Sequence, residues 1–191
     1  MVWIWVNPDE DRVPVWADYD DRRSGLDGSE VLDGKRLPPD SGNAIFCTEQ
    51  FGSRKVRSLH CLPTTGSAPV IDEELRKIIV RVAGPDEVQF YPVSVDTVDG
   101  RVEGYSFVIP LNRITCTDLQ KSVITAWTVP NKYAYGYRSL RLLPNCLNGL
   151  AIARDDVTNV IVVSDALRDA LVETKDKGLA FTWPEETRSL F

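Results

Sequence analysis

Short runs of hydrophobic residues, several of them alternating with polar ones, predict β-strands in this chain. Valines and tryptophans make up residues 2–6 (VWIWV) and 13–17 (VPVWA), and the turn-forming cluster NPDEDR separates the two runs. This pair predicts a hairpin. Residues 88–95 and 105–111 predict two further strands around an Asp99-Gly100 turn.

Two other stretches repeat hydrophobic residues at the spacing of an amphipathic helix. Asp72 is placed to cap a helix that begins at Glu73, and four apolar residues then recur at i, i+3, i+4 and i+7. Ser164 is placed to cap a second helix with the same spacing. Gly84 and Gly178 are the expected stop signals of the two helices.

The two helical stretches align with each other. Residues 70–80 (VIDEELRKIIV) match residues 162–172 (VVSDALRDALV) without a gap at an offset of 92, and a strand that carries Phe and then Pro follows each helix. Because cap, apolar stripe and following strand agree, we favour an internal duplication of a strand-helix-strand unit. The alternative is chance similarity between two amphipathic helices.

Three weaker patterns fill the remaining chain. Thr117 is placed to cap a short helix over residues 118–126, and residues 149–154 and 160–163 flank DDVTN as a third hairpin. Residues 18–43 are polar and rich in Gly, Asp and Pro, with one short apolar element around Val31 and Leu32. A loop of this length is uncommon in a compact domain unless it binds a partner or stays mobile.

These elements predict the fold class and the domain organisation. We expect an α+β protein with an antiparallel-rich sheet, a few short helices and two similar strand-helix-strand units. The length of 191 residues suits a single domain over residues 1–191. Within it, residues 1–68 hold N-terminal strands and acidic loops, and residues 69–191 hold the two related units.

The distribution of charge predicts the kind of partner. The net charge is -6, and residues 1–40 alone hold ten acidic and five basic residues. Such a surface repels nucleic acid, whose affinity for proteins comes from clustered Lys and Arg, and attracts a basic protein. Tyr133, Tyr135 and Tyr137 alternate as if to stack bases, but the acidic balance favours packing as their role.

The N-terminus and the cysteines predict a cytoplasmic protein. The first apolar run has no positive stretch before it and breaks at Asn7 and Pro8, so it is too short for a signal peptide or a membrane span. The four cysteines are scattered without CxxC pairing and are expected to be buried, reduced thiols. They are Cys47, Cys61, Cys116 and Cys146.

Catalytic chemistry has little support in the sequence. His60 is the single histidine, and its neighbour Cys61 would face the other side of a strand, so a Cys-His pair would need Cys47 or Cys116 through the fold. Motifs for phosphate loops, dinucleotide turns, nucleophile elbows and zinc proteases are missing. We therefore predict no enzyme activity and no cofactor.

Metal binding is also not expected. One histidine and four separated cysteines lack the paired spacing of a zinc site. Residues 18–21 (DYDD) are dense in acids, but Arg23 and Ser29 stand where a calcium loop of the EF-hand type needs Gly and Glu. A solvated acidic loop is the better interpretation.

A spread pattern of caps and core positions resembles the bacterial Imm11-type immunity family. VSDALRDAL followed by a Gly-Leu-x-Phe strand matches one unit of that family, VIDEELRKII with VQFYPV matches a second, and TDLQKS lies between. The likeness covers residues 69–184, and GKRLP at 34–38 matches more weakly. The matching residues are Ser164, Leu167, Gly178, Leu179, Phe181, Ile71, Leu75, Phe90, Pro92, Asp118 and Ser122.

This resemblance implies a cytoplasmic protein encoded beside a polymorphic toxin, which it binds stoichiometrically and neutralises. The acidic balance then favours a basic toxin surface, such as that of a nuclease, with carboxylates speeding association and aromatic anchors adding affinity. The alternative is an acidic segment that only keeps the protein soluble. The expected partner-binding residues are Asp9, Asp11, Trp16, Asp18, Tyr19, Asp20 and Asp21.

Two functions of other classes stay open at this point. One is an enzyme that modifies a small molecule or a toxin through His60 and a cysteine, and the other is a general protein-interaction module. A homo-oligomer is compatible with each of them.

Overall fold

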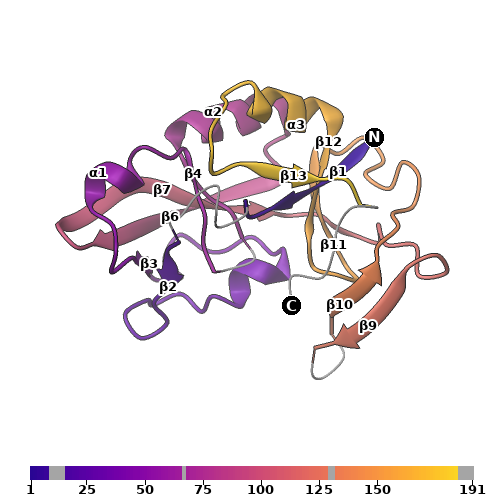
Figure 1. The fold of residues 1–191 in the computed structure, drawn as a ribbon, viewed down its shortest axis with the longest axis horizontal. Helices are drawn as coiled ribbons and strands as arrows, with labels where there is room; N and C mark the ends of the chain where they lie inside the picture. The colour runs from indigo at the N-terminus through magenta and orange to yellow at the C-terminus, as the bar shows by residue number, and fades with distance from the viewer. Residues whose placement is uncertain (9–15, 66–67, 129–131, 185–191) are drawn as a thin grey trace.

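The protein folds as a sheet-rich structure with a few short helices, which is compatible with the predicted α+β class (Figure 1). The computed structural model describes residues 1–8, 16–65, 68–128 and 132–184. Its helices are short: η1 (Glu30–Asp33), α1 (Ser53–Val56), α2 (Glu73–Val82) and α3 (Asp165–Val172).

One sheet has six strands and forms the larger half of the body. Its strands in spatial order are β2 (Asp18–Tyr19), β3 (Ala44–Cys47), β6 (Val88–Thr97), β7 (Gly100–Pro110), β5 (Val70–Asp72) and β4 (Cys61–Leu62). β3 and β6 run parallel, and the other neighbours are antiparallel. The predicted hairpin around Asp99-Gly100 is confirmed as β6 and β7, which are longer than expected.

The second sheet has five strands and joins the two ends of the chain. In spatial order they are β13 (Ala180–Thr182), β1 (Val2–Val6), β12 (Ile161–Ser164), β11 (Ile152–Asp155) and β8 (Arg113–Ile114). The predicted hairpin of β11 and β12 is confirmed. β9 (Val123–Trp127) and β10 (Ala134–Ser139) pair with each other as a separate ribbon.

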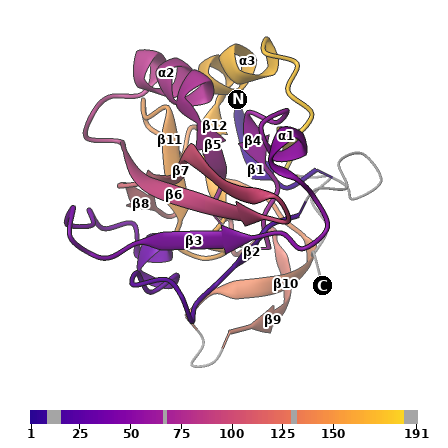
Figure 2. The same cartoon turned by 90° about the vertical axis from the view of Figure 1, so that its left-hand side faces the viewer.

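The two predicted helix caps are confirmed. The Asp72 carboxylate accepts hydrogen bonds from the backbone N–H groups of Glu74 and Leu75 at 3.0 and 3.2 Å, and Ser164 Oγ accepts from Leu167 N at 3.3 Å. α2 and α3 lie side by side in both views (Figures 1 and 2) and pack against each other. Their apolar stripes are buried between the helices and the two sheets, with Leu75, Ile79, Leu167 and Leu171 fully buried.

Each helix connects two strands in the same way. α2 leads from β5 to β6, and β7 lies between these two strands, antiparallel to both. α3 leads from β12 to β13, and β1 lies between them, again antiparallel to both. The two units therefore share a split strand-helix-strand arrangement with an inserted central strand.

The predicted N-terminal hairpin is wrong. β1 is hydrogen-bonded to β12 on one edge and to β13 on the other, so neither edge is left for residues 13–17. Ile4 and Trp5, on opposite faces of β1, are both buried, which explains a run without polar residues. Residues 13–15 lie outside the described residues, and Ala17 bridges Thr64.

The predicted helix over 118–126 is also wrong. The Asp118 carboxylate accepts from the backbone N–H groups of Gln120 and Lys121, which makes a turn, and β9 follows. The β-branched and aromatic residues of β9 suit a strand better than a helix.

The expected stop at Gly178 is misplaced, because α3 ends at Val172 and Lys175 takes the left-handed conformation with φ of 57°. Gly178 has a packing role instead. A Cβ there would lie 1.7 Å from the Cys61 carbonyl oxygen, so any larger residue would push β4 away.

Candidate functional site

The acidic loop, defined here as residues 18–23, is anchored by Tyr19. β2 pairs with β3 so that Tyr19 lies opposite Phe46, and the Tyr19 ring packs on Phe46 and Phe107 with centroid distances of 5.3 and 6.0 Å. Its hydroxyl donates to the Leu26 carbonyl at 2.5 Å, and burial raises the pKa of the phenol. Tyr19 therefore holds the loop on the core more than it reaches outward.

Asp20 organises the loop from within. Its carboxylate accepts from the backbone N–H groups of Arg22 and Arg23, both at 3.1 Å, and from Arg23 Nε at 2.6 Å. Arg23 also reaches Asp96 at 2.7 Å, and Arg101 holds the other oxygen of Asp96 at 2.6 Å. Hydrogen bonds from Arg23 and from Arg101 lower the pKa values of Asp20 and Asp96 respectively.

The remaining predicted contact residues differ in accessibility. Asp18 and Asp21 are exposed and form no ion pair with any described residue. Trp16 is half-buried, and its Nε1 has no hydrogen-bond acceptor among the described residues. Asp9 and Asp11 lie outside the described residues. The structure thus places Asp18 and Asp21 as the two available carboxylates of the acidic loop.

His60 belongs to an acidic cluster at the start of α2. Its Nδ1 lies 2.7 Å from Asp72 Oδ2, and its Nε2 lies 3.8 Å from Glu74. The backbone N–H groups of His60 and Cys61 donate to Asp176 at 2.7 and 3.2 Å. One carboxylate, Asp72, therefore both caps α2 and binds the imidazole.

A catalytic Cys-His pair is not formed. Cys61 is buried, and desolvation raises the pKa of its thiol, which disfavours the nucleophilic thiolate. Cys47 lies on β3, which is four strand spacings from β4, or about 19 Å from the strand that follows His60. Cys116 is engaged in a disulfide.

The His60 cluster predicts a pH dependence of stability. The hydrogen bond to Asp72 raises the His60 pKa above its unfolded value of about 6.5, so protonated His60 stabilises the folded state. This contribution is fully present below the unfolded pKa and is lost as pH rises through the folded pKa. We expect the urea midpoint of the wild type, relative to His60→Gln, to fall between pH 6 and pH 9, about half a unit below and two and a half units above the unfolded value. Parallel midpoint curves for the two proteins would contradict this linkage.

The expectation of four free thiols is wrong for two of them. Cys116 and Cys146 form a disulfide across 30 residues of sequence, while Cys61 is buried and Cys47 half-buried, both free. Disulfides persist mainly in oxidising environments, so this bond argues against the cytoplasmic location. That location stays a prediction. Among the described residues, no helix is long and apolar enough to cross a membrane.

A buried polar centre at the β11–β12 turn was missed by the sequence analysis. Asp155 is fully buried and accepts hydrogen bonds from Cys116 N, from the N–H and hydroxyl of Thr117, and from the N–H and hydroxyl of Thr158, all between 2.7 and 3.0 Å. The DDVTN sequence indicates a turn, but nothing in it tells that the first Asp is buried.

Arg154, next to Asp155, is fully buried as well. Its Nη1 donates to the Asn159 carbonyl at 2.7 Å, and its Nε and Nη2 find no acceptor in the part of the chain that the structure describes. Burial lowers the Arg154 pKa to about 10. This buried cation opposes folding unless it is compensated elsewhere.

Residues 1–8, 16–65, 68–128 and 132–184 form no constellation typical of an active site. A depression of about 830 Å³ lies beside the N-terminus, and its described lining is mostly apolar and contains no carboxylate side chain and no histidine. No cluster of three or more His, Cys, Asp or Glu side chains that could hold a metal ion occurs in the parts of the chain that the structure describes.

Comparison with known families identifies the chain. The model of the Imm11 immunity protein family matches residues 32–184, which is 153 of the 191 residues. The chain belongs to the Imm11 immunity protein family. The Imm11 match extends the resemblance noted from 69–184 back to η1, and the acidic loop lies just before it. No curated protein matches the chain significantly.

Proposed function

We propose that this Imm11 protein acts in the bacterial cytoplasm by binding one cognate toxin molecule and covering the toxin surface that causes damage. The observation that carries the proposal is the family match over residues 32–184. The missing Cys-His pair and the missing metal cluster, among the described residues, agree with inhibition by contact.

The acidic loop is proposed as a steering element for a basic toxin surface. Asp18 and Asp21 present carboxylates without a described ion-pair partner, so their field is not cancelled locally. Asp20 and Tyr19 shape the loop and do not contact the toxin themselves. Asp20 is bound by Arg23, and Tyr19 packs on Phe46 in the core. Asp9, Asp11 and Trp16 remain part of the proposed contact set on the strength of the sequence alone.

Genetic protection tests the function itself. Co-expression of the chain with the toxin encoded beside its gene should restore growth of the host to that of cells without toxin. A well-folded, abundant product that leaves the toxin lethal would rule the proposal out.

The steering role predicts a kinetic effect. The double variant Asp18→Asn/Asp21→Asn should slow association with the toxin about 10-fold at low salt, with little change in the dissociation rate, because exposed charges act mainly on the encounter. Stopped-flow fluorescence at several salt concentrations measures both rates.

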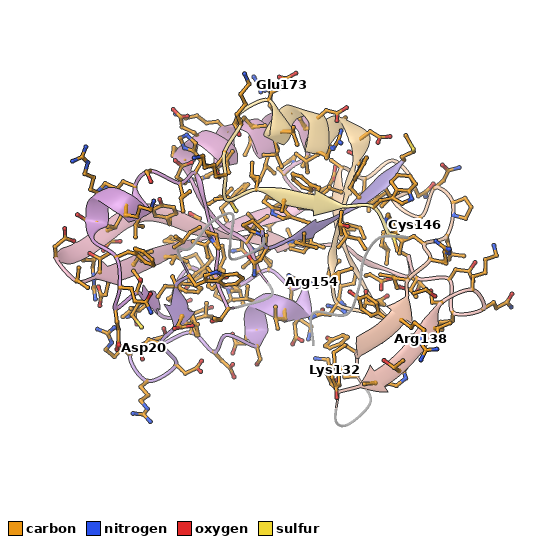
Figure 3. All side chains as sticks on the ribbon, viewed as in Figure 1. Asp20, Lys132, Arg138, Cys146, Arg154 and Glu173 are labelled. Carbon is orange, nitrogen blue, oxygen red and sulfur yellow. A yellow bond between two sulfur atoms is a disulfide. The ribbon has the colours of Figure 1, made fainter. Side chains whose placement is uncertain are left out.

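A control variant removes two exposed acidic charges elsewhere. Asp86 and Glu173 are exposed, and Figure 3 shows Glu173 on the opposite side of the body from Asp20. Asp86→Asn/Glu173→Gln should keep the wild-type rate within about twofold. If both double variants slow association equally, the effect comes from net charge, and the steering role of the acidic loop is contradicted.

A further inference from the structure

A two-stranded arm leaves the body of the protein. The arm is defined here as residues 117–128 and 132–145, and within it β9 and β10 pair with each other and with no strand of either sheet among the described residues. Figure 1 shows this ribbon below β11 of the five-stranded sheet, and Figure 2 shows it at the lower edge of the molecule. An isolated two-stranded hairpin is only marginally stable in water, so this ribbon depends on its contacts with the body.

Exposed apolar side chains are concentrated on the arm. Nine large hydrophobic residues are exposed among those described, and five of them lie in this one segment. Trp127 is 40% exposed, Val123 48% and Tyr135 45%. The arm members of the set are Leu119, Val123, Trp127, Tyr135 and Leu143. A cluster of this kind marks an interaction surface, whereas single exposed hydrophobics need no explanation.

The two faces of the arm differ in burial. Ile124 pairs with Tyr137, and Tyr137 is 7% exposed, so this face is turned to the body. Val123 and Trp127 lie on the other face of β9, because alternate residues of a strand point to opposite sides. The outer face therefore presents a tryptophan and a valine to solvent.

The arm is fixed at both of its ends. The Cys116–Cys146 disulfide closes the base, where Asp118 N donates to the Arg141 carbonyl at 2.8 Å. At the other end, where β10 begins, Ala134 N donates to the Val157 carbonyl at 2.7 Å and Lys132 pairs with Asp33 at 2.9 Å. The Arg113 guanidinium lies 5.1 Å from the centre of the Tyr133 ring. An arm held in this way is preorganised, so less conformational entropy is lost when it binds.

The charge of the arm is opposite to that of the chain. Residues 117–145 hold four basic residues against the single acid Asp118, a net charge of +3, whereas the whole chain is at -6. Arg138 is exposed and forms no ion pair with a described residue. Lys121 pairs with Asp118 and Lys132 with Asp33, and Figure 3 shows Arg138 on the right of the view and Asp20 on the left.

We propose that the arm is a second toxin-contact element, whose outer face docks on an apolar depression of the toxin bordered by carboxylates. Trp127 and Val123 supply the buried apolar contact, and Arg138 pairs with an acidic group at the border. This inference rests on the proposed function. It adds a second contact surface whose charge is opposite to that of the acidic loop. The two elements then hold two different regions of one toxin.

Binding of arm variants to the neighbouring toxin tests the inference. By calorimetry, Trp127→Ala should weaken the affinity about 30-fold or more, as expected for an aromatic hot spot. Val123→Ser should weaken it less, and Arg138→Glu should slow association about 10-fold at low salt. Val123→Ser and Arg138→Glu should unfold close to the wild type, and Trp127→Ala should stay folded with a lower midpoint, because that side chain is 40% exposed.

Matched controls carry the same changes away from the arm. Val98 is an exposed valine of the β6–β7 turn, and Arg54 is an exposed arginine of α1. Val98→Ser and Arg54→Glu should keep wild-type affinity within about twofold. Wild-type affinity in Trp127→Ala and in Arg138→Glu would overturn the inference while leaving the proposed function intact.

The remaining outcomes separate other occupants of the arm. A wild type that fails to bind the toxin at all removes the proposed function, and this inference with it. Tight binding of a single-stranded oligonucleotide, lost in Trp127→Ala, would overturn the inference in favour of nucleic acid. A dimer in light scattering that Trp127→Ala abolishes would overturn it in favour of a second copy of the chain.

Discussion

Replacing Asp155 with Asn is expected to lower the free energy of unfolding by about 3–5 kcal/mol, the largest stability loss predicted for this protein. The fully buried carboxylate accepts five hydrogen bonds, from Cys116, Thr117 and Thr158. An amide at this position offers one acceptor oxygen and turns an NH₂ donor toward groups that also donate. Urea denaturation of the purified variant measures the loss.

The neighbouring carboxylate provides the control. Asp156 pairs with Arg113 at 3.0 Å, but its side chain is 45% exposed, so Asp156→Asn should cost no more than about 1 kcal/mol. If Asp155→Asn unfolds at the same urea concentration as Asp156→Asn, the buried polar centre does not stabilise the fold as described.

Removal of the Cys116–Cys146 disulfide is expected to cost about 2–4 kcal/mol. The bond closes a segment of 30 residues, and opening it returns conformational freedom mainly to the unfolded chain. The double variant Cys116→Ala/Cys146→Ala and the wild type in excess dithiothreitol should show similar urea midpoints, both below that of the oxidised wild type.

Free cysteines serve as the control for this prediction. Cys47 is half-buried and unpaired, so Cys47→Ala should change the midpoint little and should leave the response to dithiothreitol intact. A wild-type midpoint that does not respond to dithiothreitol would mean that the disulfide contributes nothing under these conditions.

Local patterns predicted those parts of the fold that local interactions decide. Asp72 and Ser164 cap their helices as expected, because a cap needs only the residues of its own first turn. The β6–β7 and β11–β12 hairpins followed from neighbouring strands with turn residues between them. These elements pair residues that are close in sequence, so the sequence contains most of the necessary information.

The errors arose where distant segments decide the outcome. β1 takes its two neighbours from the far end of the chain, and no residue in VWIWV signals such long-range pairing. The Cys116–Cys146 bond likewise joins residues that only the fold brings together. The duplication of the two strand-helix-strand units stays a prediction, and their shared topology supports it.

The candidate site shows the same division. Acidic composition pointed to residues 18–21, but the sequence could not tell that Asp20 is bound by Arg23 while Asp18 and Asp21 remain exposed. The arm was not predicted, because β9 was interpreted as part of a helix over 118–126. The exposure of Trp127 on the outer face of the arm can be recognised only once the pairing of β9 with β10 is known.

Titration of toxin activity against molar equivalents of this protein tests the central claim most directly. Inhibition by contact predicts that residual activity falls in a straight line and reaches zero at one equivalent. Complete inactivation by a small fraction of an equivalent would show catalytic modification of the toxin, and full activity at excess protein would show no inhibition; either result would contradict the account.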